Sequence, residues 1–229
     1  MTLQQTGYSE TSTGTSVEPY VALDDTCANA TEQATFEVEG EQRYRASAYG
    51  LLASLLRSAP DQAMLDHVAT LANDVPDEGD DMLLSMATLG LSAKMHDPAV
   101  LEDEFHELFI GIGKGELSPY ASWYLTGFLM EKPLSDLRED LAELGYQRSE
   151  GNAEPEDHAA SLCEVMSMLI LDNCELSRQR DFCNKHILSW MGSFMRDMSD
   201  ARSAVFYQAL GRFGAAFLAL EGEYLAMQS

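Results

Sequence analysis

The chain has 229 residues, of which 45% are hydrophobic and 23% are charged, the balance of an ordinary globular protein. The charge is unusual, because 38 acidic residues against 14 basic ones give a net charge of −24. Proteins that bind nucleic acid or anionic membrane surfaces depend on lysine and arginine, so this balance argues against both kinds of partner. It favours solubility and cationic partners.

The sequence before Arg43 has neither the basic nor the apolar region of a secretory signal. No uncharged apolar stretch reaches about 18 residues, so we expect no membrane span. The cysteines form no C-x-x-C pair, which favours reduced thiols over disulfides or a zinc site; they are Cys27, Cys163, Cys174 and Cys183. We therefore expect a cytoplasmic protein without a bound metal.

Residues 1–40 are rich in serine, threonine, glycine and acidic residues, and no basic residue precedes Arg43. Such a composition buries too little apolar surface to offset the entropy of ordering, so we expect a mobile acidic tail. From residue 41 to 229 the apolar spacing is helical, which indicates one helical domain.

The helices are expected in chain order, with proline and glycine marking several boundaries. The expected ranges are one from Glu41, then 61–72, 79–95, 98–110, 118–131, Pro133 to Gly145, one from Pro155, 179–198 and 200–226. No run alternates with period 2 as a strand would. The sequence predicts an all-α fold of about eight or nine helices, with a hinge at about 146–154 between its N-terminal and C-terminal portions.

Three motifs have both a structural and a functional interpretation. The glycine-rich stretch 111–115 follows an expected helix, so a helix connection is favoured over a phosphate-binding loop. Phe105, Leu108 and Phe109 share one helix face, which suits a core position or the floor of a binding surface. The spacing Phe182-x-x-x-His186-x-x-x-Trp190 suits a core seam with a hydrogen-bonded histidine.

The segment Glu154-Pro155-Glu156-Asp157-His158 concentrates three carboxylates and an imidazole where a helix is expected to begin. One interpretation is a negatively charged helix terminus, where the helix dipole favours acids. The other is general-base chemistry, in which an acid raises the basicity of His158. On a helix, adjacent Asp157 and His158 would point about 100° apart and could not form a simple dyad.

Together these motifs resemble the TorD/DmsD family of molybdoenzyme maturation chaperones, also called redox-enzyme maturation proteins. The resemblance rests on aromatic-x-x-Leu-Phe at residues 105–109, on Gly111 and Gly113, on Pro119-Tyr120-Ala121-Ser122, and on E-P-x-D-H at residues 154–158. The Phe182, His186 and Trp190 pattern also matches. The resemblance covers about residues 41–229 and leaves the acidic tail without a counterpart.

The resemblance implies an all-helical, non-catalytic chaperone that binds the twin-arginine leader and the body of a molybdoenzyme precursor. It holds the precursor back from export until the molybdopterin cofactor is inserted. The implied leader-binding residues are Phe105, Leu108, Phe109, Tyr120, Ser122, Glu154, Pro155, Asp157 and His158. The resemblance implies no tightly bound cofactor and leaves weak guanine nucleotide binding open. It also leaves open a monomer or a domain-swapped dimer, and which molybdoenzyme is the client.

The chemistry of a twin-arginine leader is consistent with this implied role. A leader with two arginines and an apolar stretch needs an apolar surface with an acidic rim. Two other functions remain as alternatives. One is a nucleotide hydrolase that uses the cluster Glu154 to His158. The other is a non-catalytic acidic helical adaptor.

Overall fold

The computed structural model describes residues 20–22, 40–73, 80–111, 115–148 and 154–227. Helices dominate these residues, which confirms the all-α prediction. The α-helices are α1 (Gly40–Arg57), α2 (Gln62–Ala69), α3 (Asp81–Met95), α4 (Pro98–Phe105), α5 (Ala121–Thr126), α6 (Lys132–Glu143), α7 (Ala159–Leu171), α8 (Leu176–Phe182), α9 (Met191–Asp200) and α10 (Phe206–Met227). No helix in the described ranges is both long and apolar enough to cross a membrane.

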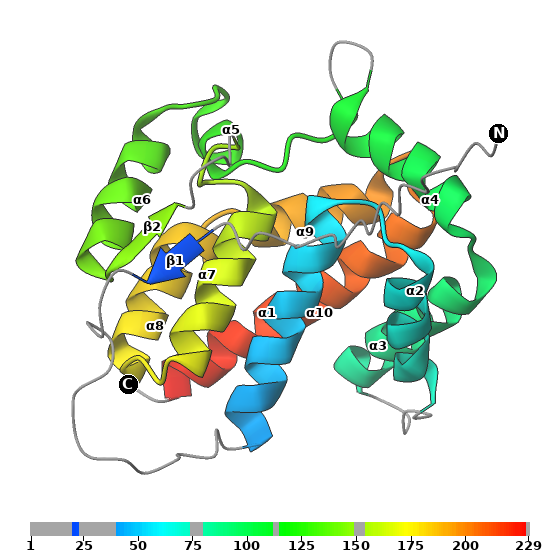
Figure 1. The fold of residues 1–229 in the computed structure, drawn as a ribbon, viewed down its shortest axis with the longest axis horizontal. Helices are drawn as coiled ribbons and strands as arrows, with labels where there is room; N and C mark the ends of the chain where they lie inside the picture. The colour runs from blue at the N-terminus through cyan, green and yellow to red at the C-terminus, as the bar shows by residue number, and fades with distance from the viewer. Residues whose placement is uncertain (1–19, 23–39, 74–79, 112–114, 149–153, 228–229) are drawn as a thin grey trace, which may run out of the picture.

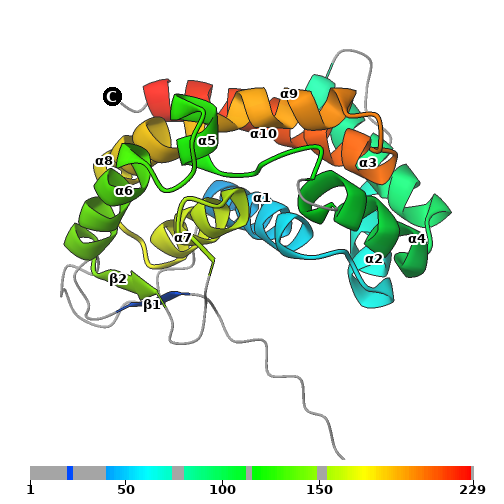
Figure 2. The same cartoon turned by 90° about the horizontal axis from the view of Figure 1, so that it is seen from above.

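The central layer consists of α1 packed against α7, and α9 and α10 form a second layer beside it (Figure 1). In the view from above, α2, α3 and α4 lie at one end of the molecule (Figure 2). At the other end lie α6, α8 and a small antiparallel ribbon of β1 (Tyr20–Ala22) and β2 (Tyr146–Arg148). One continuous hydrophobic core runs through both layers.

A buried ion pair joins α1 to α10. The Arg45 guanidinium donates two hydrogen bonds to the Glu221 carboxylate, at 2.8 and 2.6 Å, and a third at 2.9 Å to the side-chain oxygen of Gln179. Its planar group also lies over the ring of Tyr224, 4.6 Å from the ring centre. Arg45 and Glu221 are 3% and 1% exposed, so each charge depends on the other for its compensation.

Several helices begin directly after an aspartate that caps their first turn. Asp61, Asp80 and Asp97 each accept a hydrogen bond from a backbone N–H in the first turn of α2, α3 and α4. Such caps satisfy amide groups that have no partner within the helix. The start of α10 is capped by a residue of α4. The Glu104 carboxylate accepts hydrogen bonds from the backbone N–H groups of Val205, Phe206 and Tyr207.

The structure corrects several expected helix boundaries. The expected helix 118–131 is confined to α5, because Gly127 adopts φ +81°. The expected helix 179–198 is interrupted by a π-helical turn at Cys183–Leu188 and a break at Trp190. A second π-helical turn, His106–Ile110, follows α4 within the expected helix 98–110. The remaining ranges agree with the prediction to within a few residues, except at two helix starts. Helix α7 begins at Ala159 and not at Pro155, and α10 begins at Phe206 and not at residue 200.

Two expectations concern segments that are largely outside the described residues. The acidic tail, residues 1–40, is described at Tyr20–Ala22, where it forms a strand, and at Gly40, where α1 begins. The expected hinge at about 146–154 begins with strand β2. Three of the cysteines are buried free thiols, and Cys27 lies outside the described ranges.

Breaking the ion pair between α1 and α10 is expected to destabilise the protein strongly. The variant Glu221→Ala leaves the Arg45 charge buried without its carboxylate partner, at a cost of about 3–5 kcal/mol in the free energy of unfolding. Urea denaturation followed by circular dichroism measures this change. The matched control is Glu223→Ala, an exposed position on the same helix. Equal stability of the two variants would contradict this role for the pair.

Candidate functional site

The E-P-x-D-H segment lies before α7 and not within it. Helix α7 begins at Ala159, and His158 is its N-cap residue. The Nδ1 atom of His158 accepts a hydrogen bond of 3.1 Å from the backbone N–H of Ala160. The expectation that Glu154, Glu156 and Asp157 occupy the first helical turn is therefore wrong, and so is the helical geometry assumed for Asp157 and His158.

Asp157 caps a different helix. Its Oδ2 atom accepts a hydrogen bond of 2.8 Å from the backbone N–H of Ser122, and its main-chain carbonyl accepts one of 3.0 Å from Ala121. Tyr120, the N-cap residue of α5, provides no side-chain cap of its own. The N–H of Ala159 in turn donates to the carbonyl of Pro119, at 2.8 Å. Asp157 and His158 thus form a double cap that fastens the starts of α5 and α7 together.

The double cap is buried and incompletely satisfied. Ser122 is 0% exposed and Asp157 is 1% exposed. The hydroxyl oxygen of Ser122 and the Oδ1 atom of Asp157 have no hydrogen-bond partner among the described residues.

The neighbouring carboxylates are engaged by arginines of the same chain. Glu154 lies 3.4 Å from Arg57. Glu156 pairs with Arg138 at 2.8 Å and with Arg148 at 3.9 Å. Burial opposes ionisation of Glu156, but the hydrogen bonds from Arg138 outweigh it and lower the pKa of this carboxyl group. The acidic rim predicted for the site exists, and it is already paired with cations.

His158 is held as a neutral imidazole. Burial, followed by the positive charge of Arg57, lowers the pKa of His158 to about 3. The ring packs edge-on against Tyr120, with ring centres 5.1 Å apart, and its Nε2 atom lies 3.5 Å from Glu154. Burial and the nearby Glu154 charge raise the pKa of the Tyr120 hydroxyl to about 12. The site therefore lowers the basicity of His158, contrary to the general-base hypothesis.

The aromatic-x-x-Leu-Phe motif packs onto the α9–α10 layer. Leu108 is fully buried, whereas Phe105 and Phe109 are half-buried against the ring of Tyr207, at 5.9 and 5.4 Å. From Phe109 a line of aromatic rings continues across the molecule. We call it the aromatic seam, and it consists of Phe105, Phe109, Phe194, Tyr124 and Trp190. It connects the motif to α5, which the double cap holds.

An exposed apolar segment follows directly on α5 and was not predicted from the sequence. Its members are Leu125, Phe128, Leu129 and Met130, which are 46%, 68%, 50% and 73% exposed. The expected helix 118–131 would have buried some of these side chains on one face. A clue was present in Gly127, which ends the helix and is followed by three apolar residues before Glu131.

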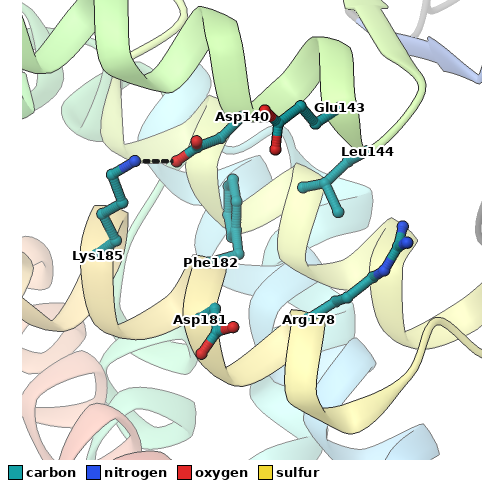
Figure 3. Close-up of a pocket in the computed structure, with 7 residues that line it drawn as sticks. All are labelled: Asp140, Glu143, Leu144, Arg178, Asp181, Phe182 and Lys185. Atoms are coloured by element: carbon teal, nitrogen blue, oxygen red, sulfur yellow. Dashed lines mark hydrogen bonds and ion pairs between the residues drawn. The ribbon is translucent and has the colours of Figure 1, made fainter.

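A pocket of about 370 Å³ lies between α6 and α8 and was also not predicted (Figure 3). Its lining residues are Asp140, Glu143, Leu144, Arg178, Asp181, Phe182 and Lys185. Asp140 accepts hydrogen bonds of 2.5 Å from Lys185 and from the ring of His186.

Phe182, His186 and Trp190 are all buried, which confirms the core seam with a hydrogen-bonded histidine.

The glycine-rich stretch connects two elements, as favoured from the sequence. Gly111 adopts φ +56°, a conformation that glycine reaches without strain. A Cβ atom at Gly115 would lie 2.5 Å from the main chain of Phe109, so Gly115 packs closely against the π-helical turn. Residues 112–114, with Gly113 among them, lie outside the described residues.

Comparison with solved structures defines the class of fold. A crystallised protein from Archaeoglobus fulgidus, described as a redox enzyme maturation protein, superposes with a TM-score of 0.51 at 20% sequence identity. The match covers 82% of this chain and 99% of that one. The chain therefore has the all-α fold of that maturation protein.

Comparison of sequences defines the family. The model of the nitrate reductase delta subunit family matches residues 60–196. The chaperone protein TorD of Vibrio atlanticus is 27% identical over 203 residues, which cover 80% of this chain and 94% of the relative. TorD of Aliivibrio fischeri is 34% identical over 139 residues, which cover 55% of this chain and 64% of the relative. The chain belongs to the TorD/DmsD family of molybdoenzyme maturation chaperones.

The depressed pKa of His158 predicts a specific sensitivity to acid. Because the pKa in the folded state is below that in the unfolded state, the contribution to stability is complete above about pH 6.5. It is lost progressively as the pH falls from about 6.5 towards about 3. The variant His158→Asn keeps a good N-cap but does not titrate. Between pH 7 and pH 4, the native protein should lose about 3 kcal/mol more of its free energy of unfolding than this variant.

Urea denaturation at a series of pH values measures this difference. His96→Asn serves as the matched control, since it removes a different, partly buried histidine. Identical acid dependence in the native protein and His158→Asn would show that the imidazole is not held neutral by its surroundings.

Proposed function

We propose that the chain is a cytoplasmic, non-catalytic chaperone that binds the twin-arginine leader of a molybdoenzyme precursor. It holds this precursor while the molybdopterin cofactor is inserted, before export. The observation that supports this function most is the exposed apolar segment, Leu125 to Met130, at the end of the short helix α5 whose start is capped by Asp157 of the E-P-x-D-H segment.

The apolar part of a leader finds its complement beside α5. Four large apolar side chains are exposed within six residues, and an exposed cluster of this kind is typical of an interaction site. Beneath this surface, the aromatic seam leads from the half-buried Tyr124 through the fully buried Phe194 to Phe109. Apolar anchors commonly cost about 2 kcal/mol or more when they are truncated, so this surface supplies most of the affinity.

The two arginines of a leader find carboxylates that already hold exchangeable partners. The side chains of Arg138 and Arg148 are 53% and 38% exposed, whereas that of Glu156 is 10% exposed. An incoming guanidinium keeps the buried Glu156 carboxylate paired and releases an arginine that is already largely in solvent, so the exchange has little net cost. The exchange fixes the register of the leader and accelerates association, and it adds little affinity.

The buried members of the predicted site act from beneath the surface. Leu108 supports Phe105 and Phe109 from the core, and Ser122, Asp157 and His158 hold α5 in place. Because α5 has six residues and rises about 9 Å, its capped start and the exposed apolar segment lie within reach of one bound peptide. Tyr120, Glu154 and Pro155 are half-buried at the boundary of this surface.

The hydrolase alternative is disfavoured by burial. A general base must reach its substrate, and His158 is 5% exposed with its Nδ1 atom committed to the cap.

Three points stay as the sequence left them. Weak guanine nucleotide binding is open, the chain is a monomer or a domain-swapped dimer, and the client molybdoenzyme is not identified.

Replacing the exposed apolar side chains is expected to weaken leader binding more than removing an acid. Phe128→Ser and Leu129→Ser should each raise the Kd of a synthetic twin-arginine leader peptide at least tenfold in isothermal calorimetry, by loss of an apolar anchor. Glu156→Ala should raise it less than fivefold, because it removes an exchangeable ion pair.

The matched control for the apolar variants is Leu220→Ser on α10, which is 45% exposed in the native chain and lies outside the proposed surface. Its affinity should equal that of the native chain. If Glu156→Ala proved more damaging than Phe128→Ser, with both proteins folded by circular dichroism, the apolar surface would not carry the affinity. Absence of leader binding by the native chain would refute the proposed function itself.

A further inference from the structure

The chain adopts a left-handed backbone conformation at two points in the connection from α5 to α6 (Figure 1). Gly127, the C-cap residue of α5, has φ +81°. Met130, which directly precedes the N-cap residue of α6, has φ +60°. The two positions bracket Phe128 and Leu129 and direct the chain from one helix into the other. The fold therefore needs a left-handed backbone at residue 130.

The fold does not need a methionine at this position. In the left-handed conformation the Cβ atom of most residues crowds the following carbonyl oxygen, whereas glycine and asparagine adopt it readily. The other residues of the described ranges that have positive φ follow this rule, and they are Gly111, Gly127, Gly145 and Asn173. Met130 is the exception, so its backbone is held at a cost that glycine or asparagine would avoid.

Packing within the described part of the chain does not repay this cost. Met130 is 73% exposed, and the neighbouring Phe128 and Leu129 are exposed as well. A buried methionine would gain free energy from its removal from water, but an exposed one gains little. A strained backbone and an apolar side chain in water coincide at one residue. The requirement for methionine therefore comes from a contact outside the folded chain.

The turn that carries Phe128 is fixed by hydrogen bonds at its start. The hydroxyl group of Thr126 donates to the carbonyl of Ser122 at 2.8 Å and accepts from the backbone N–H of Phe128 at 3.2 Å. The N–H of Gly127 donates to the carbonyl of Trp123 at 2.8 Å. Less conformational freedom is lost when a ligand binds to a turn that is already ordered in this way.

We propose that Met130 is a binding residue for the apolar stretch of the leader, and that its strained backbone is retained for this contact. This inference rests on the proposed function and names the part of the leader that the exposed apolar segment takes. The segment from Leu125 to Met130 includes no charged side chain, so its complement is the apolar stretch and not the arginine pair. Methionine suits this contact because its unbranched thioether adapts to apolar side chains of different shape.

The variant Met130→Asn is expected to change stability and binding in opposite directions. Its urea midpoint should rise, because asparagine adopts the left-handed conformation at a lower cost than methionine. The Kd of a synthetic peptide with two consecutive arginines and an apolar stretch should rise about fivefold in calorimetry, by loss of an apolar anchor. A residue with a purely structural role would not combine greater stability with weaker binding.

Two further variants separate the side chain from the backbone. Met130→Leu keeps an apolar side chain of similar volume on the strained backbone, and it should bind the peptide within about twofold of the native chain. Asn173→Gly changes the other non-glycine residue with positive φ, which follows α7 and lies outside the apolar segment. It is the matched control and should leave the Kd unchanged.

Three results would overturn the inference while the native chain binds the peptide. They are an unchanged Kd in Met130→Asn, a lower urea midpoint in that variant, and equally weak binding by Met130→Leu and Met130→Asn. Absence of peptide binding by the native chain would instead refute the proposed function, and this inference with it.

Discussion

The geometry of the site depends on one buried carboxylate. Helix α5 has six residues and no side-chain cap of its own, so it is too short to persist without help. Asp157 supplies the missing cap from a segment 35 residues away, while His158 caps α7 immediately beside it. The apolar segment that follows α5 is therefore presented by a contact between two parts of the chain. A short capped helix of this kind places apolar side chains in water without letting them collapse into the core.

The same region shows how a chain with a net charge of −24 uses its few arginines. Arg57 bridges Glu154 and Glu164, and Arg138 and Arg148 lie on Glu156. The hydrogen bonds from Arg138 lower the pKa of Glu156 and so favour the ionised form of this buried carboxylate. The family accounts for the fold and for the role of chaperone, and the proposed exchange of arginines would take place at these pairs.

Much of the helical architecture could be predicted from local signals. Asp61, Asp80 and Asp97 begin helices as caps, and the apolar spacing identifies the faces that are buried. The site was harder to predict, because its decisive contact is not local. Acids before an apolar run look like a first helical turn, and nothing near Asp157 in the sequence shows that it caps a helix elsewhere. The exposure of Phe128 and the pairing of β1 with β2 likewise depend on tertiary placement.

The most direct test of the double cap combines hydrogen exchange with peptide binding in the variant Asp157→Ala. The account predicts that amide protection is lost in α5 and retained in α1, α7 and α10, and that the affinity for a twin-arginine leader peptide falls at least tenfold. The variant Asp157→Asn, which keeps an acceptor oxygen for the Ser122 amide, should retain most of the protection. Loss of α5 protection with unchanged leader affinity would contradict the account, because leader binding would then not depend on the position of α5.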